Sequence, residues 1–411
     1  MMRIQPVRGT HDIYGIDLEK FNTIEKMIKI SANSFGFDEI ITPIFESSDL
    51  FSKPLGEKSD VVLKEMYTFN DRNNSSLTLR PEYTAPIIRA AISNNLLNKL
   101  PAKFFGIGPM FRRERPQKGR FREFYQMNFE IFGTNDTLAD AELILLASSI
   151  LINILPNQQF KLHINSLGDR DTLKSFKLEL SSFFSKYKND LSEDSQRKID
   201  TNPLRILDSK NPKDIEISKD APDINNLYSS EAKKKFEDVQ ALLNETNMSF
   251  VVDNTLVRGL DYYCHTVFEF KNHNLGTQDT VIGGGRYDGL IKMIGGPDIP
   301  GVGWAGGIER LMLLMDLPRK NMIRNHLIVI DESLKNYGIK VLSILHENQI
   351  PIYWGYKYNL KKSLAFANDK KAEFVIIIGE EEYKNNKYTL KNLFDSSQET
   401  LSLEELIKKL S

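Results

Sequence analysis

One short segment carries a large share of the side chains that could hold an anion. Between Arg112 and Glu123 the sequence has six cations and two acids, although the whole chain has a formal net charge of −1. Alternating apolar residues flank this segment, which predicts two β-strands joined by a basic turn. Arginine can bind phosphate and carboxylate oxygens through two parallel hydrogen bonds. The segment therefore predicts a site for a polyanion such as a nucleoside triphosphate.

The second strand of this predicted hairpin divides into two faces, because successive side chains point in opposite directions. One face would carry Tyr125, Met127, Phe129 and Ile131, and is expected to face the core. The other would carry Arg122, Phe124, Gln126, Asn128 and Glu130. Patterning alone leaves a solvated face and a ligand face about equally favoured, but an aromatic ring among arginines can stack on a purine. On the first strand, Gly106 and Gly108 predict open space above the sheet.

Two further arginines stand in unusual settings. Arg258 lies in LVRGLDYYCHTVFEF between apolar residues, where burial is costly unless Asp261 or a substrate anion compensates its charge. Arg310 follows GVGWAGG, which matches G-x-G-x-x-G but lacks the preceding buried strand and βαβ unit of a dinucleotide fold. These glycines predict a strand-to-helix turn that approaches a ligand. The alternative for Arg310 is a surface ion pair with Glu309 or Asp316.

Other catalytic and metal chemistries find little support in the sequence. The six histidines show no metal-ligand spacing, and Cys264 is the single cysteine, so neither a zinc site nor an internal disulfide is expected. The chain lacks G-x-x-x-x-G-K-[ST], so a triphosphate would have to be held by arginine side chains. No protein-held metal ion is predicted.

The surrounding elements can be outlined from the apolar spacing. Residues 18–35 predict a helix closed by Gly36. GFDEIITPIFE predicts one strand, which Pro43 places at an edge of a sheet or at a subunit contact. A hairpin at EMYTF and SLTLR and a helix at 83–98 follow. The apolar run at 143–155 is too short for a membrane span and predicts a buried helix.

Two later regions change character. Charged helical segments dominate about 161–247, which predicts a helical insertion within a larger domain. After Leu317 a βαβαβ pattern predicts a small, parallel-rich sheet in a unit of its own. The N-terminus has no apolar signal core, so a cytoplasmic location is expected.

These segments together resemble the class II aminoacyl-tRNA synthetases, and within that class the histidyl-tRNA synthetase family. FDEIITPIFE, FRRERPQKGRFREFYQ and GVGWAGGIERL are similar to the three class motifs. LVRGLDYYCHTVFEF and GGGRYDGL resemble the histidine-specific signatures, and LRPEYTAPIIRA and NPLRILDSKNPKD fit the same family. The resemblance covers essentially the whole chain. It implies an α+β fold with an antiparallel-sheet catalytic domain at 1–320, the helical insertion, and a C-terminal α/β anticodon-binding domain at 325–411.

The resemblance also implies an activity and its reactants. L-Histidine would be activated with ATP, accompanied by Mg²⁺ at the β- and γ-phosphates, and transferred to the 3′ end of tRNA(His). Arg112 would bind the α-phosphate, and Arg258 would bridge it to the histidine carboxylate. The residues implied at ATP are Arg112, Glu114, Arg120, Phe124 and Arg310. Those implied at histidine are Glu82, Tyr83, Thr84, Arg112, Gln126, Glu130, Arg258, Tyr262, Tyr263 and Tyr287.

Some positions depart from the family pattern. Tyr83 and Asn128 stand where many bacterial members have glycine, and Tyr125 stands where many have histidine. These departures concern specificity and leave the arginines intact. The resemblance further implies a homodimer and no membrane partner. The alternative is the paralogue that serves as the regulatory subunit of ATP phosphoribosyltransferase, which is expected to lack the C-terminal domain and the intact arginine set.

Overall fold

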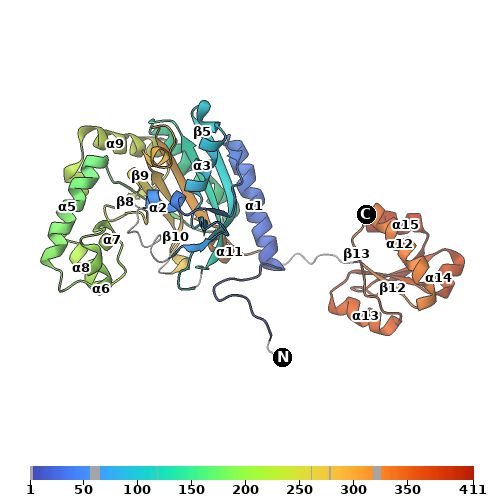
Figure 1. The fold of residues 1–411 in the computed structure, drawn as a ribbon. Coiled ribbons are helices and arrows are strands. Elements are labelled where there is room, and N and C mark those ends of the chain that lie inside the picture. The colour runs from blue at the N-terminus through green and yellow to red at the C-terminus, as the bar shows by residue number, and fades with distance from the viewer. Residues whose placement is uncertain (1–2, 56–64, 118, 261, 277–278, 318–324) are drawn as a thin grey trace. The chain divides into compact units, whose positions relative to one another are not determined.

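The structure of the chain is a computed structural model that describes residues 3–55, 65–117, 119–260, 262–276, 279–317 and 325–411. The chain divides into two compact units, Met1–Leu317 and Pro318–Ser411 (Figure 1). Among the described residues, no helix is long and apolar enough to cross a membrane. The apolar run at 143–155 lies in a largely buried helix up to its last residue, Ile154, as predicted.

An eight-stranded sheet forms the centre of the first unit, in the order β1-β5-β6-β11-β10-β9-β7-β8. The strands are β1 (Asp38–Glu39), β5 (Ala102–Phe111), β6 (Glu123–Phe132), β7 (Lys161–Ser166), β8 (Phe250–Val252), β9 (Cys264–Lys271), β10 (Thr280–Arg286) and β11 (Gly301–Gly307). The β1–β5 and β7–β8 pairs are parallel and the others antiparallel. The predicted α+β class with an antiparallel-rich catalytic sheet is therefore confirmed.

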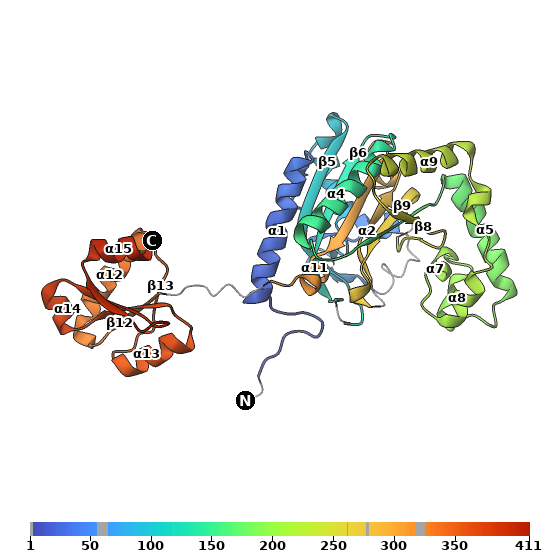
Figure 2. The ribbon, with the colours of Figure 1, turned by 180° about the vertical axis from the view of Figure 1, so that it is seen from behind.

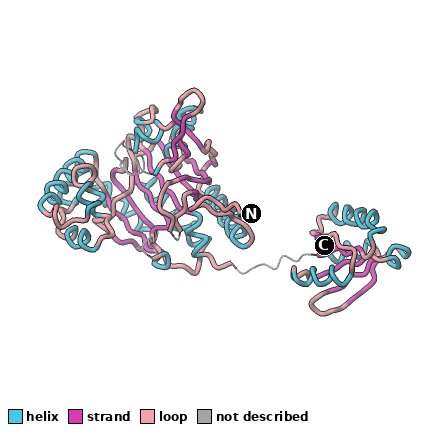
Figure 3. The backbone as a smooth tube through the Cα atoms, turned by 60° about the horizontal axis from the view of Figure 1, so that its bottom comes forward, coloured by secondary structure: helices cyan, strands magenta, loops and turns pink. Residues whose placement is uncertain are grey.

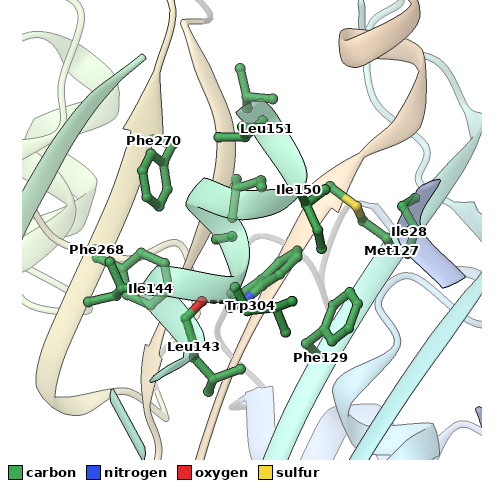
Figure 4. Close-up of a cluster of buried hydrophobic side chains, with 14 of the residues drawn as sticks. Ile28, Met127, Phe129, Leu143, Ile144, Ile150, Leu151, Phe268, Phe270 and Trp304 are labelled. Carbon is green, nitrogen blue, oxygen red and sulfur yellow. Dashed lines mark hydrogen bonds between the residues drawn. The ribbon is translucent and has the colours of Figure 1, made fainter. Parts of the chain in front are cut away.

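One face of this sheet is covered by α1 (Ile16–Ser34), α4 (Leu138–Ile154) and α11 (Ile308–Leu314). Figure 2 shows α1 and α4 on the near side of β5 and β6. Gly36 ends α1 with a φ of 72°, the left-handed conformation predicted for it. Trp304 of β11 stacks on Phe129 of β6 at 4.6 Å, and its Nε1 donates to the Leu143 carbonyl at 3.0 Å (Figure 4). The core face predicted for the second hairpin strand is thus found in this layer.

The opposite face carries a three-stranded sheet and two short helices. Their bounds are β2 (Phe45–Ser47), β3 (Tyr67–Asn70), β4 (Ser76–Leu79), α2 (Asp49–Leu55) and α3 (Thr84–Ser93). β3 and β4 form the predicted hairpin. The helix predicted at 83–98 is shorter than expected, because Asn95 takes a left-handed φ of 56° and Leu96–Asn98 forms a separate 3₁₀ turn, η2.

The prediction of a single strand at GFDEIITPIFE was wrong. The segment forms β1 at the edge of the large sheet and β2 at an edge of the small one. Between them, the Thr42 carbonyl accepts from the buried Arg80 guanidinium at 2.9 Å instead of joining a ladder. Pro43 also lacks an N–H to donate, so the chain crosses between the two sheets there.

The helical insertion lies beyond the edge of the large sheet that β7 and β8 form (Figure 1). Figure 3 shows a group of helices, in cyan, beside the magenta strands of this unit. It consists of α5 (Arg170–Lys186), α6 (Glu193–Lys198), α7 (Leu204–Leu207), α8 (Pro212–Ser218), η3 (Ile224–Leu227) and α9 (Ser230–Glu245). The residues from Lys161 to Ser166, which the sequence assigned to the insertion, form β7 of the main sheet. The remaining short elements of this unit are η4 (His273–Leu275) and α10 (Leu290–Met293).

The second unit has a mixed five-stranded sheet in the order β13-β12-β14-β15-β16. Its elements are β12 (Asn325–Val329), η5 (Glu332–Leu334), α12 (Lys335–Glu347), β13 (Ile352–Trp354), α13 (Leu360–Asp369), β14 (Phe374–Ile378), α14 (Glu380–Asn385), β15 (Tyr388–Asn392), β16 (Gln398–Leu401) and α15 (Leu403–Leu410). β12, β13 and β14 are parallel, whereas β15 and β16 are antiparallel. The α/β pattern predicted for this region is confirmed.

Candidate functional site

A cavity of about 470 Å³ opens over the sheet, between the β5–β6 hairpin, the Arg258 segment and the helical insertion. Most of the predicted site residues line it. They are Glu82, Thr84, Arg112, Glu114, Arg120, Phe124, Gln126, Arg258, Tyr262, Tyr263 and Arg310. Tyr83, Glu130 and Tyr287 are fully or almost fully buried and lie outside the lining. Segments far apart in the sequence thus converge on one hollow.

The hairpin supplies two guanidinium groups to this cavity. Arg112 follows the last residue of β5, where its Nε donates to the Pro81 carbonyl at 2.8 Å. Its guanidinium carbon lies 5.4 Å from the centroid of the Phe124 ring on β6. Arg120 pairs with Glu114 at 2.9 Å. The basic turn is therefore anchored at its base, while Phe124 and both arginines border the same space.

Two more guanidiniums reach the cavity from other elements. Arg310 stands in the first turn of α11 and donates to the Thr280 carbonyl of β10. Burial lowers its pKa, and the neighbouring Arg120 and Arg112 charges lower it further. This contact differs from the surface ion pairs with Glu309 or Asp316 considered from the sequence. Such mutual repulsion between arginines is relieved when an anion binds among them.

Arg258 is paired with Glu269 of β9. The partner considered from the sequence, Asp261, lies outside the described residues. Burial opposes the charged form of Arg258, but the Glu269 carboxylate and neighbouring tyrosines outweigh it and raise the pKa. Its guanidinium carbon lies 5.7 Å from the Tyr263 ring centroid. Arg258 is thus held charged at the cavity wall.

Several buried polar atoms around the cavity lack hydrogen-bond partners among the described residues. They are Gln126 Oε1, Asn128 Oδ1 and Arg258 Nε. Buried polar groups in folded proteins are nearly always hydrogen-bonded, so such a cluster indicates a ligand that supplies both donors and acceptors. A zwitterionic amino acid has both.

Glu130 lies beneath the cavity and is completely buried. Its carboxyl group accepts from Thr84 Oγ1 at 2.7 Å and from the Tyr287 hydroxyl. Burial raises its pKa to about 8, against the opposing effect of these hydrogen bonds. The solvated strand face considered from the sequence is therefore wrong at Glu130, and also at Asn128, which is 1% exposed.

Gly303 makes the space for this carboxyl group. It pairs directly opposite Glu130 across the β6–β11 ladder. A Cβ at Gly303 would lie 1.7 Å from Glu130 Oε2, so a side chain cannot be added without moving the carboxyl. The glycines of GVGWAGG, at 301–307, were expected to let a ligand approach, and Gly307 does line the cavity. At Gly303, however, the space is taken by the protein's own side chain.

Glu82 and Tyr83 have structural contacts at the start of α3. The Glu82 carboxylate accepts from the Thr84 and Ala85 backbone N–H groups at 2.7 and 2.9 Å. Tyr83 packs against Gly106, where a Cβ would lie 2.4 Å from its ring. Arg80 similarly fills the space at Gly108, so the open space predicted above these glycines is occupied.

Three tyrosine rings form one wall of the buried end. Tyr262 lies 4.8 Å from Tyr263 and 5.7 Å from Tyr287, measured between ring centroids. Tyr287 is 1% exposed, and burial is the first cause that raises its pKa well above the ordinary value. These rings therefore stay neutral at physiological pH and can serve as hydrogen-bond donors.

Sequence reasoning missed Glu269, and it considered Glu309 only as an ion-pair partner of Arg310. Glu269 accepts from Arg258 and from Thr280 Oγ1 at 2.8 Å. Both oxygens of Glu309 accept from the Tyr125 backbone N–H, at 2.9 and 3.0 Å, and so tie α11 to β6. A signal existed at Glu269, because it is an acidic residue within the otherwise apolar run VFEF.

Two groups of residues bear on metal binding. Cys264, His265 and Asp288 have possible ligand atoms within 4.8 Å of one another, but they lie outside the cavity lining. The Cys264 sulfur already accepts from the Asp288 N–H, and Arg286 lies 3.5 Å from Asp288, so this cluster is a poor cation site. Glu269 and Thr280 offer a carboxylate and a hydroxyl within the cavity, which are ligand types that Mg²⁺ prefers. Because Glu269 is paired with Arg258 and lies 3.7 Å from Lys271, bound phosphates would have to supply most of the ligands and offset these cations.

Known proteins with similar sequences place the chain in a family. A family model for histidyl-tRNA synthetase matches residues 9–311, and one for an anticodon-binding domain matches residues 324–411. A histidine–tRNA ligase from Ehrlichia chaffeensis is 44% identical over 99% of this chain and 98% of its own length. One from Wolbachia pipientis wMel is 42% identical over the full length of both.

Solved structures agree with this assignment. The crystal structure of apo S. aureus histidyl-tRNA synthetase is 32% identical, with a TM-score of 0.79 and full coverage of both chains. A structure described as an ATP phosphoribosyltransferase regulatory subunit/histidyl-tRNA synthetase from Bacillus halodurans C has a TM-score of 0.63 at 19% identity, which shows a shared fold. The family resemblance seen in the sequence motifs is confirmed: the chain belongs to the histidyl-tRNA synthetase family.

Proposed function

We propose that this chain is a histidine–tRNA ligase. The carboxylate of L-histidine attacks the α-phosphorus of ATP, the bond to the β-phosphate oxygen breaks, and pyrophosphate leaves. A ribose hydroxyl at the 3′ end of tRNA(His) then attacks the activated carbonyl, and AMP leaves. The family membership supports this activity. The structural observation that supports it most is that Arg112, Arg120, Arg258 and Arg310 all border one cavity.

The cavity suits a reaction that depends on charge and alignment more than on a general base. Arg112 and Arg258 would hold the α-phosphate and the histidine carboxylate together, since both guanidiniums have N–H groups left to donate. Phe124 and Arg310 would stack on adenine, with Glu114 and Arg120 beside the nucleotide. Mg²⁺, held by Glu269 and Thr280, would neutralise charge on the outer phosphates when bound.

The buried end of the cavity suits the amino acid. Gln126, with its unpartnered oxygen, would accept from the histidine ammonium group together with Glu82 and Thr84. Glu130, Tyr263 and Tyr287 would surround the imidazole, with Tyr83 and Tyr262 packed around them. A carboxyl group selects a side chain that donates from nitrogen, and leaving it without that donor would be costly.

The same family supports several wider proposals. The C-terminal unit would bind the anticodon arm of tRNA(His), the chain would act as a homodimer, and it would work in the cytoplasm. The regulatory-subunit alternative is less well supported. This chain carries an anticodon-binding domain at 324–411, and all four arginines of the signature line the cavity.

Histidine-dependent exchange of labelled pyrophosphate into ATP tests the activity directly. The purified chain is expected to catalyse exchange with histidine and none without it, and a folded protein without exchange would refute the proposal. Arg258→Ala should slow exchange by about 100-fold or more, the scale for removing a preorganised charge donor. Arg197→Ala, which changes an exposed arginine of the insertion, is the matched control and should leave the rate unchanged.

A further inference from the structure

The helical insertion contributes a side chain to the cavity through its short helix α7. Leu204 and Ile206 of this helix are buried in the same apolar cluster as Leu256 and Val257. The latter two residues directly precede Arg258, so α7 packs against the segment that carries this arginine. Arg205, between the two buried residues, lines the cavity. Figure 1 shows α7 at the side of the insertion that faces the sheet.

The Arg205 guanidinium differs from the other four in the cavity. Arg112, Arg120, Arg258 and Arg310 each bind an oxygen of the protein. In the described part of the chain, the Arg205 side chain makes no hydrogen bond or ion pair, although it is half-buried. Partial burial of an unpaired cation is unfavourable unless an anion compensates it. Its charge is therefore available to a reactant.

The position of Arg205 is set by a glycine. A Cβ at Gly259 would lie 2.8 Å from Arg205 Nη1, so this guanidinium rests on the backbone immediately after Arg258. Any larger residue at 259 would displace it. The insertion thus brings a guanidinium with no partner among the described residues beside the arginine that we place at the carboxylate and α-phosphate.

We propose that Arg205 is a phosphate-binding residue of the ligase site. This inference rests on the proposed function and deepens it, because it makes the insertion a direct contributor to reactant binding. The phosphate belongs either to the triphosphate of ATP or to the last phosphodiester at the 3′ end of the tRNA. Both present the same oxygens to a guanidinium.

Arg205→Gln and Arg205→Lys test the proposal, with Arg197→Gln as the control at an exposed arginine of α6. Two rates are measured: pyrophosphate exchange over a range of ATP concentrations, and single-turnover transfer from preformed histidyl-adenylate to tRNA. Loss of a charge-assisted hydrogen bond should slow the dependent step about 10- to 100-fold in Arg205→Gln, with partial recovery in Arg205→Lys. Slower exchange with a raised KM for ATP identifies the nucleotide phosphate. Slower transfer with normal exchange identifies the RNA phosphate.

The proposal is overturned if both rates in Arg205→Gln match those of Arg197→Gln. A fall that Arg205→Lys does not relieve also overturns it, because that pattern indicates a structural role. If the unmodified chain shows no exchange, the proposed function fails instead. Calorimetric affinities of the unmodified and Arg205→Gln proteins for ATP and for tRNA then decide on Arg205 alone, and equal affinities would refute its role.

Discussion

The carboxyl group of Glu130, at the buried end of the cavity, has a strongly raised pKa. Burial raises its pKa to about 8, so near neutral pH it carries a proton in the folded ligand-free chain. In the unfolded chain it would ionise near pH 4.5. Its stabilising contribution is therefore complete below that value and is lost as the pH rises through about 8.

Glu130→Gln should remove this pH dependence. We expect the unmodified chain to lose up to about 4 kcal/mol more than the variant in free energy of unfolding between pH 5 and pH 8.5. Urea denaturation at both pH values measures the difference. Parallel losses in the two proteins would show that Glu130 is ionised in the folded state across this range.

The same variant tests the role of Glu130 in substrate selection. Histidine affinity should fall by about 10-fold or more, since the glutamine amide has one acceptor oxygen where the carboxylate has two. ATP affinity should change far less, because the nucleotide would lie near Phe124 and Arg310. Isothermal titration with each substrate compares the two, and equal losses would contradict an imidazole contact.

A substitution at Gly303 can displace the Glu130 carboxyl group without changing the chemistry of Glu130 itself. In Gly303→Ala the new methyl would meet Glu130 Oε2 at 1.7 Å and the Phe129 carbonyl at 2.7 Å. We expect a stability loss of about 2 kcal/mol from overpacking, together with a raised KM for histidine. Gly355→Ala is the control, because its Cβ would meet its nearest atom at 3.5 Å. A variant that loses stability but keeps its histidine KM would separate Glu130 from substrate binding.

For single residues, the sequence correctly predicted on which face of a strand a side chain lies, but it predicted the burial of side chains poorly. Parity correctly separated Met127 and Phe129 from Gln126 and Glu130. It could not show that Glu130 is buried, because that burial depends on Thr84, Tyr287 and Gly303 from distant segments. Local pattern contains no information about such partners.

Among the elements, the three short helices α6, α7 and α8 of the insertion are linked by one carboxylate. Asp214 of α8 accepts from the hydroxyls of Ser192, Ser195 and Ser209, at 2.6 to 2.7 Å, and from the Ser192 N–H. Although burial opposes ionisation, these hydrogen bonds lower its pKa. Its stabilisation is therefore present above the ordinary pKa of 3.8 and is lost as the pH falls through the lowered value.

Asp214→Asn should loosen α6, α7 and α8 together. The amide can accept fewer of the donated bonds, so we expect local stability to fall by about 2 kcal/mol. Hydrogen exchange of amides in 192–218 at pH 7 should accelerate, while amides in β6 and β11 keep their protection. Asp194→Asn, at an exposed acid of α6, is the control. Unchanged exchange in 192–218 would show that the serine cluster is dispensable.

Sequence patterns fail to predict element boundaries where the chain passes from one sheet or layer to another. The segment around Pro43 has strand-forming composition, yet its carbonyls at Thr42 and Pro43 accept from the Arg80 guanidinium and do not join a ladder. The segment is therefore divided between two sheets. Similarly, residues 161–166 belong to the main sheet even though charged helices follow. Element types were mostly predictable, whereas their assignment to layers depended on contacts across the fold.

For the whole molecule, the apolar cores follow the two compact units. Each cluster of buried apolar residues lies wholly within Met1–Leu317 or wholly within Pro318–Ser411. The unit that contains Trp354 and Leu390 has its own sheet and its own core. Each unit therefore has the apolar contacts needed for independent folding.

A chain that ends at Leu317 tests how the activity divides between the units. All the residues that line the cavity precede this position, so histidine-dependent exchange should remain within about threefold of the full chain. Transfer of histidine to tRNA should fall in kcat/KM by about 100-fold, because the second set of RNA contacts and its effective concentration are lost. Single-turnover transfer at saturating tRNA should recover much of that rate, since the missing unit would contribute affinity and not chemistry. If exchange fell as far as transfer in a folded truncated chain, the tail would be required for the catalytic site itself.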